Sequence, residues 1–223
     1  MLNVEAITNQ KIAVGLVENP CCFRLREYAA KVPADQAIVE LGAFKGRTTG
    51  WLALGASEGN GAVVHSVDPW DEGEIPEGYE AHAPSVVEYV KGETRAAYEK
   101  HLDDCGIRDL VRVHQATAVD AAAEWDTDLD GRVGLLWHDA LHLRENVRDD
   151  LRAWLPHLAS DAVIVVHDIG DAEIGEEVLA GVRDVFGRRK AWKSRELVPW
   201  VKRNPDGTPR PMHKRGFLVL KLG

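Results

Sequence analysis

The feature that most constrains the fold is an alternation of short apolar runs with longer amphipathic segments. Val133–Trp137 and Val163–Val166 are two such runs, and Glu145–Leu158 between them carries apolar residues at helical spacing. Parallel strands need a long crossover connection, which is usually a helix. The pattern therefore predicts neighbouring parallel strands in an α/β sheet.

The same alternation extends over most of the chain. The expected strands are residues 37–41, 62–67, 110–114, 133–137, 163–166, 196–201 and 216–222. The expected helices are residues 47–57, 93–105, 119–125, 145–158 and 174–186. No helix separates the last two strands, so they can pair as a hairpin, which makes one of them antiparallel. The predicted fold class is α/β, a doubly wound, mostly parallel seven-stranded sheet (Rossmann-like) with a C-terminal antiparallel strand.

Two regions depart from this alternation. Residues 1–34 are predicted to be an N-terminal helical segment, broken at Asn19-Pro20, because the residue before a proline is pushed out of the helical region. Residues 35–223 then form the α/β domain. Within it, residues 70–92 contain two prolines and many acids, and they are predicted to be a loop or insertion near the site.

Charge and cysteine content narrow the expected partners. The net charge is −9, but the chain from Arg188 onward has 11 Lys and Arg against 2 Asp and Glu, which leaves −18 on the rest. An acidic body argues against nucleic-acid binding, so the expected partner is a small-molecule substrate. The basic end is either a solvated face or a contact for an anionic group.

The three cysteines favour a cytoplasmic protein. The chain has an odd number of cysteines, and they lack the spacing of a metal site. We therefore expect reduced thiols at Cys21, Cys22 and Cys105. No apolar run is long enough to span a bilayer, so no membrane contact is expected. The N-terminal helices are candidates either for covering a cofactor or for a homo-oligomer surface.

Titratable residues follow the two strands named first. Asp139 comes just after one strand, His142 one helical turn later, and His167-Asp168 just after the next strand. Ligands bind beyond the carboxyl ends of parallel strands, so Asp139, His142 and Asp168 are expected to meet in one cleft. Carboxylates there can hold a hard cation, and a histidine can accept a proton.

Each of these residues also has a structural interpretation. Asp139 is at a position where it can cap the following segment. His142 can be a surface side chain, and His167 can be a buried, hydrogen-bonded side chain rather than a ligand. His138 precedes Asp139 on the strand, so its side chain is expected on the opposite face.

A glycine turn follows the first strand. The pattern Glu40-x-Gly42-x-x-x-Gly46 lies between strand and helix, and Asp68 ends the second strand, where an acid can accept hydrogen bonds from ribose hydroxyls. The spacing differs from the Gly-x-Gly-x-x-Gly of dinucleotide sites, and it suits adenosine attached to an amino acid. Trp70, two residues on, is expected either to stack on adenine, to line the substrate pocket or to anchor the following loop.

From about Gln36 onward the sequence resembles class I S-adenosylmethionine-dependent methyltransferases. The most specific part is similar to small-molecule O-methyltransferases of the macrocin and catechol type, and it comprises Asp139, His142, Val147, Asp150, Leu151, Trp154, Pro156, Leu158, His167 and Asp168. The resemblance implies S-adenosyl-L-methionine as cofactor, contacted by Glu40, Gly42, Gly46, Asp68, Trp70, Ala116 and Asp139. It also implies His142 as general base.

The resemblance further implies a divalent cation, by expectation Mg²⁺, with Asp139, Asp168 and His167 as ligands. Related enzymes often carry Glu-Asp or Asp-Asn where this chain has His167-Asp168, and an imidazole suits a transition metal better than Mg²⁺. Asp171 is a substitute ligand in this interpretation. Alternative functions are a metal-independent methyltransferase on another acceptor and a non-catalytic nucleotide-binding partner subunit. The glycine spacing disfavours an NAD-dependent oxidoreductase.

Overall fold

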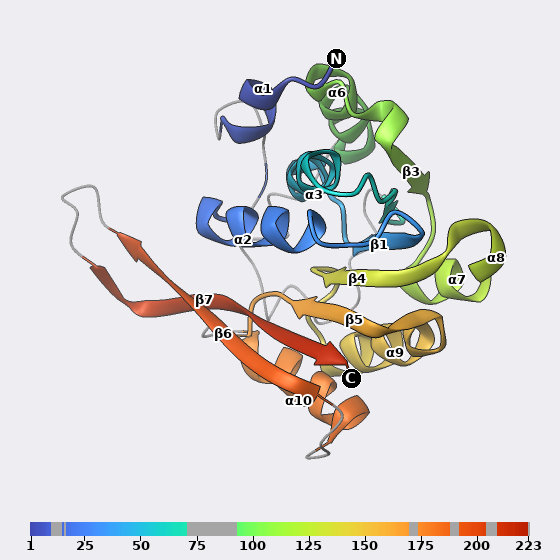
Figure 1. Cartoon of the computed structure of the whole chain (residues 1–223). Helices are drawn as coiled ribbons and strands as arrows, with labels where there is room; N and C mark the ends of the chain where they lie inside the picture. Colours follow the sequence, from blue (N-terminus) through green and yellow to red (C-terminus); the bar gives the residue numbers. More distant parts are fainter. Residues whose placement is uncertain are drawn as a thin grey trace.

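One mixed sheet organises the protein (Figure 1). The computed structural model describes residues 1–9, 15, 17–70, 93–169, 174–187, 192–203 and 209–222. In these residues the sheet has the strand order β3-β2-β1-β4-β5-β7-β6. The strands are β1 (Gln36–Leu41), β2 (Val64–Val67), β3 (Val111–His114), β4 (Arg132–His138), β5 (Leu158–Val166), β6 (Trp192–Arg203) and β7 (Pro209–Leu222). Strands β1 to β5 pair in parallel, and β7 runs antiparallel to both β5 and β6. The predicted mostly parallel, doubly wound sheet with a C-terminal antiparallel strand is confirmed.

Helices cover both faces of the sheet. They are α1 (Val4–Thr8), α2 (Asn19–Ala29), α3 (Arg47–Glu58), α6 (Thr94–Cys105), α7 (Ala118–Ala123), α8 (Thr127–Asp130), α9 (Arg144–Trp154) and α10 (Gly175–Phe186), with short 3₁₀ turns η1 (Arg108–Leu110) and η2 (Leu155–His157). Side chains of α1, α2, α3 and α6 share one buried core with alternate strand residues such as Ile38. Side chains of α7, α9 and α10 share the other core with their neighbours, such as Val39. The period-two alternation of the strands thus divides the protein into two cores.

The helix between β4 and β5 shows how the sequence pattern becomes packing. Val147, Leu151 and Trp154 are buried against the sheet, as their helical spacing predicts. The α-helix ends at Trp154 and passes into the 3₁₀ turn η2, because Pro156 has no backbone N–H to continue the helical hydrogen bonds. The predicted helix end at Leu158 is therefore wrong, since Leu158 is the first residue of β5.

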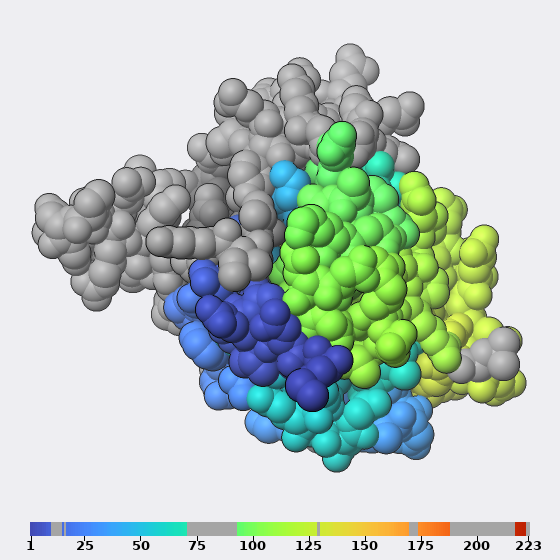
Figure 2. Space-filling view, turned by 90° about the horizontal axis from the view of Figure 1, so that it is seen from above, coloured from blue at the N-terminus to red at the C-terminus, as the bar shows by residue number. Residues whose placement is uncertain are grey.

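The N-terminal helices pack into the same core as α3. Helix α2 begins at Asn19 with Pro20 in its first turn, which agrees with the predicted break. Helix α1 lies beside α6, where the backbone N–H of Asn3 donates to the Cys105 carbonyl at 2.8 Å. Figure 2 shows this N-terminal segment lying against the α6 region on the molecular surface. No described helix is long and apolar enough to cross a membrane.

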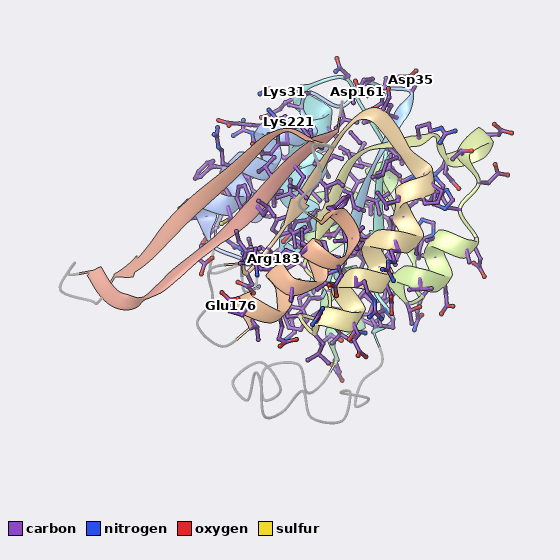
Figure 3. The ribbon with its side chains drawn as sticks, turned by 90° about the horizontal axis from the view of Figure 1, so that it is seen from below. Lys31, Asp35, Asp161, Glu176, Arg183 and Lys221 are labelled. Atoms are coloured by element: carbon purple, nitrogen blue, oxygen red, sulfur yellow. The ribbon has the colours of Figure 1, made fainter. Side chains whose placement is uncertain are left out.

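The late strands are longer than predicted and form a ribbon that projects beyond the rest of the sheet (Figure 1). At the end of this ribbon where β7 pairs with β5, Lys221 lies near Lys31, Asp35 and Asp161 at one edge of the molecule (Figure 3). Asp35 directly precedes β1, so this edge is the amino-terminal edge of the parallel strands. The predicted loop at 70–92 lies outside the described residues from position 71 onward.

Strand register places the carboxyl ends of four strands in line. Leu41 of β1 pairs with Val67 of β2 and with His138 of β4, and His138 pairs with Val166 of β5. All four strands therefore end at the same level, and the residues that follow them must lie side by side.

A buried contact behind this edge yields a stability prediction. The His138 Nε2 lies 3.0 Å from a carboxylate oxygen of Asp150, and both residues are buried. Asp150→Ala leaves this imidazole without its partner, so we expect a loss of about 2 to 3 kcal/mol in the free energy of unfolding. Asp149→Ala is the matched control, because Asp149 is exposed and pairs with its neighbour Arg148, so its loss should stay within about 0.5 kcal/mol. Chemical denaturation of both variants measures the difference, and equal losses would contradict the assignment.

Candidate functional site

Backbone hydrogen bonds continue one residue beyond the strands and fix the floor of the candidate site. The Gly42 amide donates to the Val67 carbonyl at 2.9 Å, and the Asp139 amide donates to the Leu41 carbonyl at 2.9 Å. The His167 amide donates in turn to the His138 carbonyl at 3.0 Å. Gly42, Asp139 and His167 therefore form a row at the carboxyl edge of the sheet, where α/β proteins bind ligands.

The structure brings Asp139, His142 and Asp168 together, as the sequence predicted. The His142 Nε2 is 3.5 Å from Asp139 Oδ1 and 3.4 Å from Asp168 Oδ2. One possible ligand atom from each of the three side chains lies within 4.8 Å of the other two. Their side chains are 12% to 16% exposed, while the His142 Nε2 and Asp168 Oδ1 atoms themselves are buried. The three residues form the Asp139–His142–Asp168 cluster.

His167 contacts this cluster from its buried side. Its Nδ1 lies 2.9 Å from Asp139 Oδ1 and 3.4 Å from Asp168 Oδ1. Because a carboxylate can only accept, the Nδ1 carries the proton and donates it to Asp139. The structure thus places His142, and not the expected His167, among the atoms that can share a ligand with both carboxylates. His167 instead orients Asp139, in agreement with the buried, hydrogen-bonded interpretation.

Opposite charges stabilise the ionised forms of this buried pair. Burial favours a neutral imidazole, but Asp168 and Asp139 outweigh it and raise the pKa of His167 well above its usual value. Burial likewise favours a neutral Asp139, but the His167 charge and the hydrogen bonds from His142 and His167 lower the pKa of Asp139. The two pKa shifts both indicate an ionised Asp139 carboxylate beside a protonated His167 imidazolium.

Asp168 also has an unusual backbone. Its φ is +54°, in the left-handed region that non-glycine residues seldom adopt, although Asp tolerates it better than most. Such conformations recur at functional sites, where surrounding contacts hold them. Here the contacts with His142 and His167 fix the direction of the Asp168 carboxylate.

The glycine turn forms between β1 and α3 as predicted, and it packs against the backbone after β4 and against α6. Gly42 has a φ of +87°, and Gly46 has a φ of +86° at the start of α3. A side chain at Gly42 would meet the Asp139 carbonyl at 2.3 Å, so the space that Gly42 spares is filled by the backbone after β4. At Gly46 a side chain would meet Tyr98 and His101 of α6.

Asp68 holds the two turns at this edge. Its carboxylate accepts from the amides of Phe44 and Trp70, both at 2.8 Å. Both partners have positive φ values, which bulky residues adopt only under constraint. The Trp70 indole donates to the Phe44 carbonyl and lies buried against Tyr98 and beneath the Arg95 guanidinium. These contacts favour the interpretation of Trp70 as an anchor.

Glu40 lies under the glycine turn in a fully buried position. The hydroxyls of Thr49 and Ser66 donate to its Oε2, while its Oε1 has no hydrogen-bond partner among the described residues. Burial raises the pKa of Glu40 to about 8, and the two hydroxyl donors only partly oppose this shift. Glu40 is therefore largely neutral at pH 7.

Other predicted positions are placed more simply. Ala116 is half-buried beyond β3, and the neighbouring Gln115 contacts the Pro69 carbonyl beyond β2, so both turns lie at the site edge. Arg144, considered as a contact for an anionic substrate, binds Asp184 of α10 at 2.7 Å. The substitute ligand Asp171 lies outside the described residues.

Two residues near the site were missed by the sequence reasoning. Glu18 and Cys21, at the start of α2, each place a possible ligand atom within 4.8 Å of one on His167. They lie almost 150 positions from His167 in the sequence, and no local motif marks them. Only the packing of α2 against the sheet brings them together.

The geometry allows proton transfer beside a bound ligand. An imidazole held between two carboxylates can accept a proton, because the carboxylates stabilise the resulting positive charge. The same two carboxylates and the imidazole nitrogen are also a suitable donor set for a divalent cation. The site therefore suits a reaction in which a nucleophile loses a proton.

Comparison with known proteins identifies the fold and the family. The family described as "Methyltransferase domain" matches residues 39–169, which is more than half of the chain. Among solved structures, the chain resembles the O-methyltransferase TomG from Streptomyces achromogenes, solved with S-adenosylmethionine, at 17% identity and a TM-score of 0.62, covering 98% of this chain and 87% of that one.

Two further structures share the fold. The TDP-rhamnose 3′-O-methyltransferase CalS11 of calicheamicin biosynthesis is 18% identical with a TM-score of 0.59, covering 99% of this chain and 87% of that one. An rRNA methylase from Streptococcus thermophilus is 12% identical with a TM-score of 0.56, covering 94% of this chain and 100% of that one. Proteins of this fold therefore act on different acceptors, and the fold alone does not choose one.

The contact between Gly42 and Asp139 yields a second prediction. Gly42→Ala adds both a left-handed backbone strain and a clash with the Asp139 carbonyl. Gly61→Ala is the matched control, because Gly61 has a φ of +78° but nothing within 4 Å of an added Cβ. We expect Gly61→Ala to lower the free energy of unfolding by about 1 kcal/mol and Gly42→Ala by about 2 kcal/mol more. Equal losses in denaturant melts would show that the turn and β4 are not packed as described.

The buried Glu40 yields a third prediction. The pKa of Glu40 lies near 8 in the folded state and at its ordinary value of 4.5 in the unfolded state, so the folded state holds a proton that the unfolded state releases between these values. Stability from this group is complete below pH 4.5 and is lost as the pH rises to 8, on the order of 5 kcal/mol in total. We expect the unfolding free energy of wild type to fall relative to that of Glu40→Gln as the pH rises from 4.5 to 8. A difference that stays constant from pH 5 to 8 would rule out the buried neutral acid.

Proposed function

The chain belongs to the methyltransferase domain family and is an S-adenosylmethionine-dependent methyltransferase, and we propose that it methylates a hydroxyl of a small molecule. The acceptor class is a sugar or a specialised metabolite. The observation that carries the proposal is the Asp139–His142–Asp168 cluster, formed at the carboxyl edge beside the Gly42 turn. A hydroxyl must lose its proton on methylation, and this cluster provides a base at the edge where the fold binds ligands.

His142 is the general base in this proposal. The acceptor oxygen attacks the methyl carbon as the carbon–sulfur bond breaks, and S-adenosylhomocysteine leaves. The hydroxyl proton passes to the His142 imidazole. Asp139 and Asp168, at 3.5 and 3.4 Å from its Nε2, stabilise the imidazolium that forms. His167 holds Asp139 in place through the 2.9 Å hydrogen bond, so the base keeps its orientation.

The cofactor is proposed to lie along the row that begins at the glycine turn. Gly42 and Gly46 shape the turn, Asp68 offers its remaining lone pairs to the ribose, and Ala116 borders the adenine. Glu40 lies beneath the amino-acid end, where its Oε1 is buried without a described partner. Asp139 separates the cofactor from the acceptor.

A divalent cation fits the same site. Asp139 and Asp168 would hold it, because carboxylate oxygens suit hard cations. When bound, such an ion lowers the pKa of a coordinated hydroxyl. His142 then serves as the acceptor of the proton, and His167 supports Asp139 from behind.

Charge supports a small acceptor over a nucleic acid. Residues 1–187 carry a net charge of −18, which repels a phosphate backbone. TomG and CalS11 act as O-methyltransferases in the biosynthesis of tomaymycin and calicheamicin, so the fold is used for such acceptors.

The fourth prediction concerns His142. Titration calorimetry should show that the protein binds S-adenosylmethionine and not NAD. On an acceptor found by screening catechols and nucleotide-linked sugars for S-adenosylhomocysteine release, His142→Ala should lower turnover about 10²- to 10⁴-fold with cofactor affinity unchanged. His157→Ala is the control. His157 lies in η2, which directly precedes β5, so it is at the amino-terminal edge of the sheet and away from the proposed site. Equal turnover in wild type and His142→Ala would remove the base assignment.

The same assay decides the alternatives. Full activity after chelation, with His142 still essential, would favour a metal-independent methyltransferase. Cofactor binding without turnover on any acceptor, and no effect of His142→Ala on a partner's activity, would favour a nucleotide-binding partner subunit.

A further inference from the structure

The second nitrogen of His167 faces away from the proposed active site. Its Nε2 is buried and has no hydrogen-bond partner among the described residues. Glu18 and Cys21 approach His167, with one ligand atom of each of the three residues within 4.8 Å of the others. A half-buried carboxylate, a buried thiol and a buried imidazole thus meet behind the Asp139–His142–Asp168 cluster. We call them the Glu18–Cys21–His167 cluster.

The start of α2 is held so that these side chains face His167. Glu18 is the residue before the helix, yet its side chain makes no capping hydrogen bond. The buried Arg47 fixes the residues on both sides of Glu18, because its Nε donates to the Val17 carbonyl at 2.7 Å and its Nη2 donates to the Asn19 side chain. Cys21 follows Glu18 by three residues, so both lie on the same side of the first turn.

The other side of His167 completes a metal-site arrangement. Histidines that bind metals usually donate their other ring N–H to a carboxylate, which fixes the ring and the tautomer. His167 does this already, with Nδ1 at 2.9 Å from Asp139. Once the imidazolium releases its second proton, the lone pair is on Nε2, the ring nitrogen that Asp139 and Asp168 leave for Glu18 and Cys21.

We propose that Glu18, Cys21 and His167 form a binding site for a transition-metal ion of the zinc type, separate from the Asp139–His142–Asp168 cluster. Thiolate sulfur, imidazole nitrogen and carboxylate oxygen are the donors that Zn²⁺ takes, and three protein ligands leave one position for water. Binding displaces the thiol proton of Cys21 and any proton on His167 Nε2 to solvent. The ion would join the start of α2 to the end of β5 and so support Asp139 through His167.

Sulfur makes this site distinguishable from the proposed active site. The Asp139–His142–Asp168 cluster contains no sulfur, so Co²⁺ bound there gives no thiolate-to-cobalt charge-transfer band. The other two cysteines serve as controls. Burial raises the pKa of the Cys22 thiol to about 12, and its Sγ donates to the Val17 carbonyl. Burial also raises the pKa of the Cys105 thiol to about 12, and Cys105 contacts His101 instead.

The fifth prediction follows, with the full-length protein stripped of metal and titrated with Co²⁺ and then with Zn²⁺. Wild type, Cys22→Ser, Cys105→Ser and His142→Ala should each show the thiolate-to-cobalt band, and Zn²⁺ should abolish it. Cys21→Ser should lack the band. Glu18→Gln should keep the band but bind Co²⁺ at least about tenfold more weakly, and Asp139→Asn about 10- to 100-fold more weakly.

Several results would overturn the proposal. These results are the absence of the band in wild type, its survival in Cys21→Ser, its loss in Cys22→Ser or Cys105→Ser, and an unchanged Co²⁺ affinity in Glu18→Gln. Glu18→Gln keeps the test decisive if Cys21→Ser does not fold, because Glu18 is only half-buried. The spectral readout needs no acceptor, so its failure leaves the methyltransferase proposal unaffected.

Discussion

The backbone hydrogen bonds that continue past the ends of four strands are the constraint on which the rest of the structure depends. They align Gly42, Asp68, Asp139 and His167, four residues from separate parts of the chain. Each of these residues then fixes another part of the edge: Asp68 holds the turns at Phe44 and Trp70, and Asp139 fills the space beside Gly42. A shift of one strand by one residue would turn its side chains to the other face and disperse the site.

The pair of Asp139 and His167 links this edge to the interior. Burying a carboxylate is unfavourable unless it is paired and hydrogen-bonded, and the imidazolium meets both needs. The pair also gives His167 two roles, because one nitrogen orients the acid of the proposed active site and the other faces Glu18 and Cys21. An active-site carboxylate and the N-terminal helix are thereby coupled through a single side chain.

The sequence predicted the elements whose signals are local. Short apolar runs located the strands, and helical spacing located α9. The positions just after two strands identified Asp139, His142 and Asp168. Features that depend on packing were not predictable in this way. The contact of Gly42 with Asp139, the position of His167 behind the acids and the approach of Glu18 and Cys21 arise only when distant segments meet. Leu158 was misassigned because a helix and a buried strand both favour apolar residues, and Pro156 decided between them.

The central claim is that a methyl donor lies on this edge with its reacting group beside the base. A crystal structure of the protein with S-adenosylhomocysteine tests it most directly. We expect the homocysteine portion to run from the Gly42 turn toward Asp139, with its sulfur on the side of His142 and the ribose hydroxyls near Asp68. A ligand bound elsewhere, or an edge closed by the protein's own side chains with no room beside His142, would contradict it.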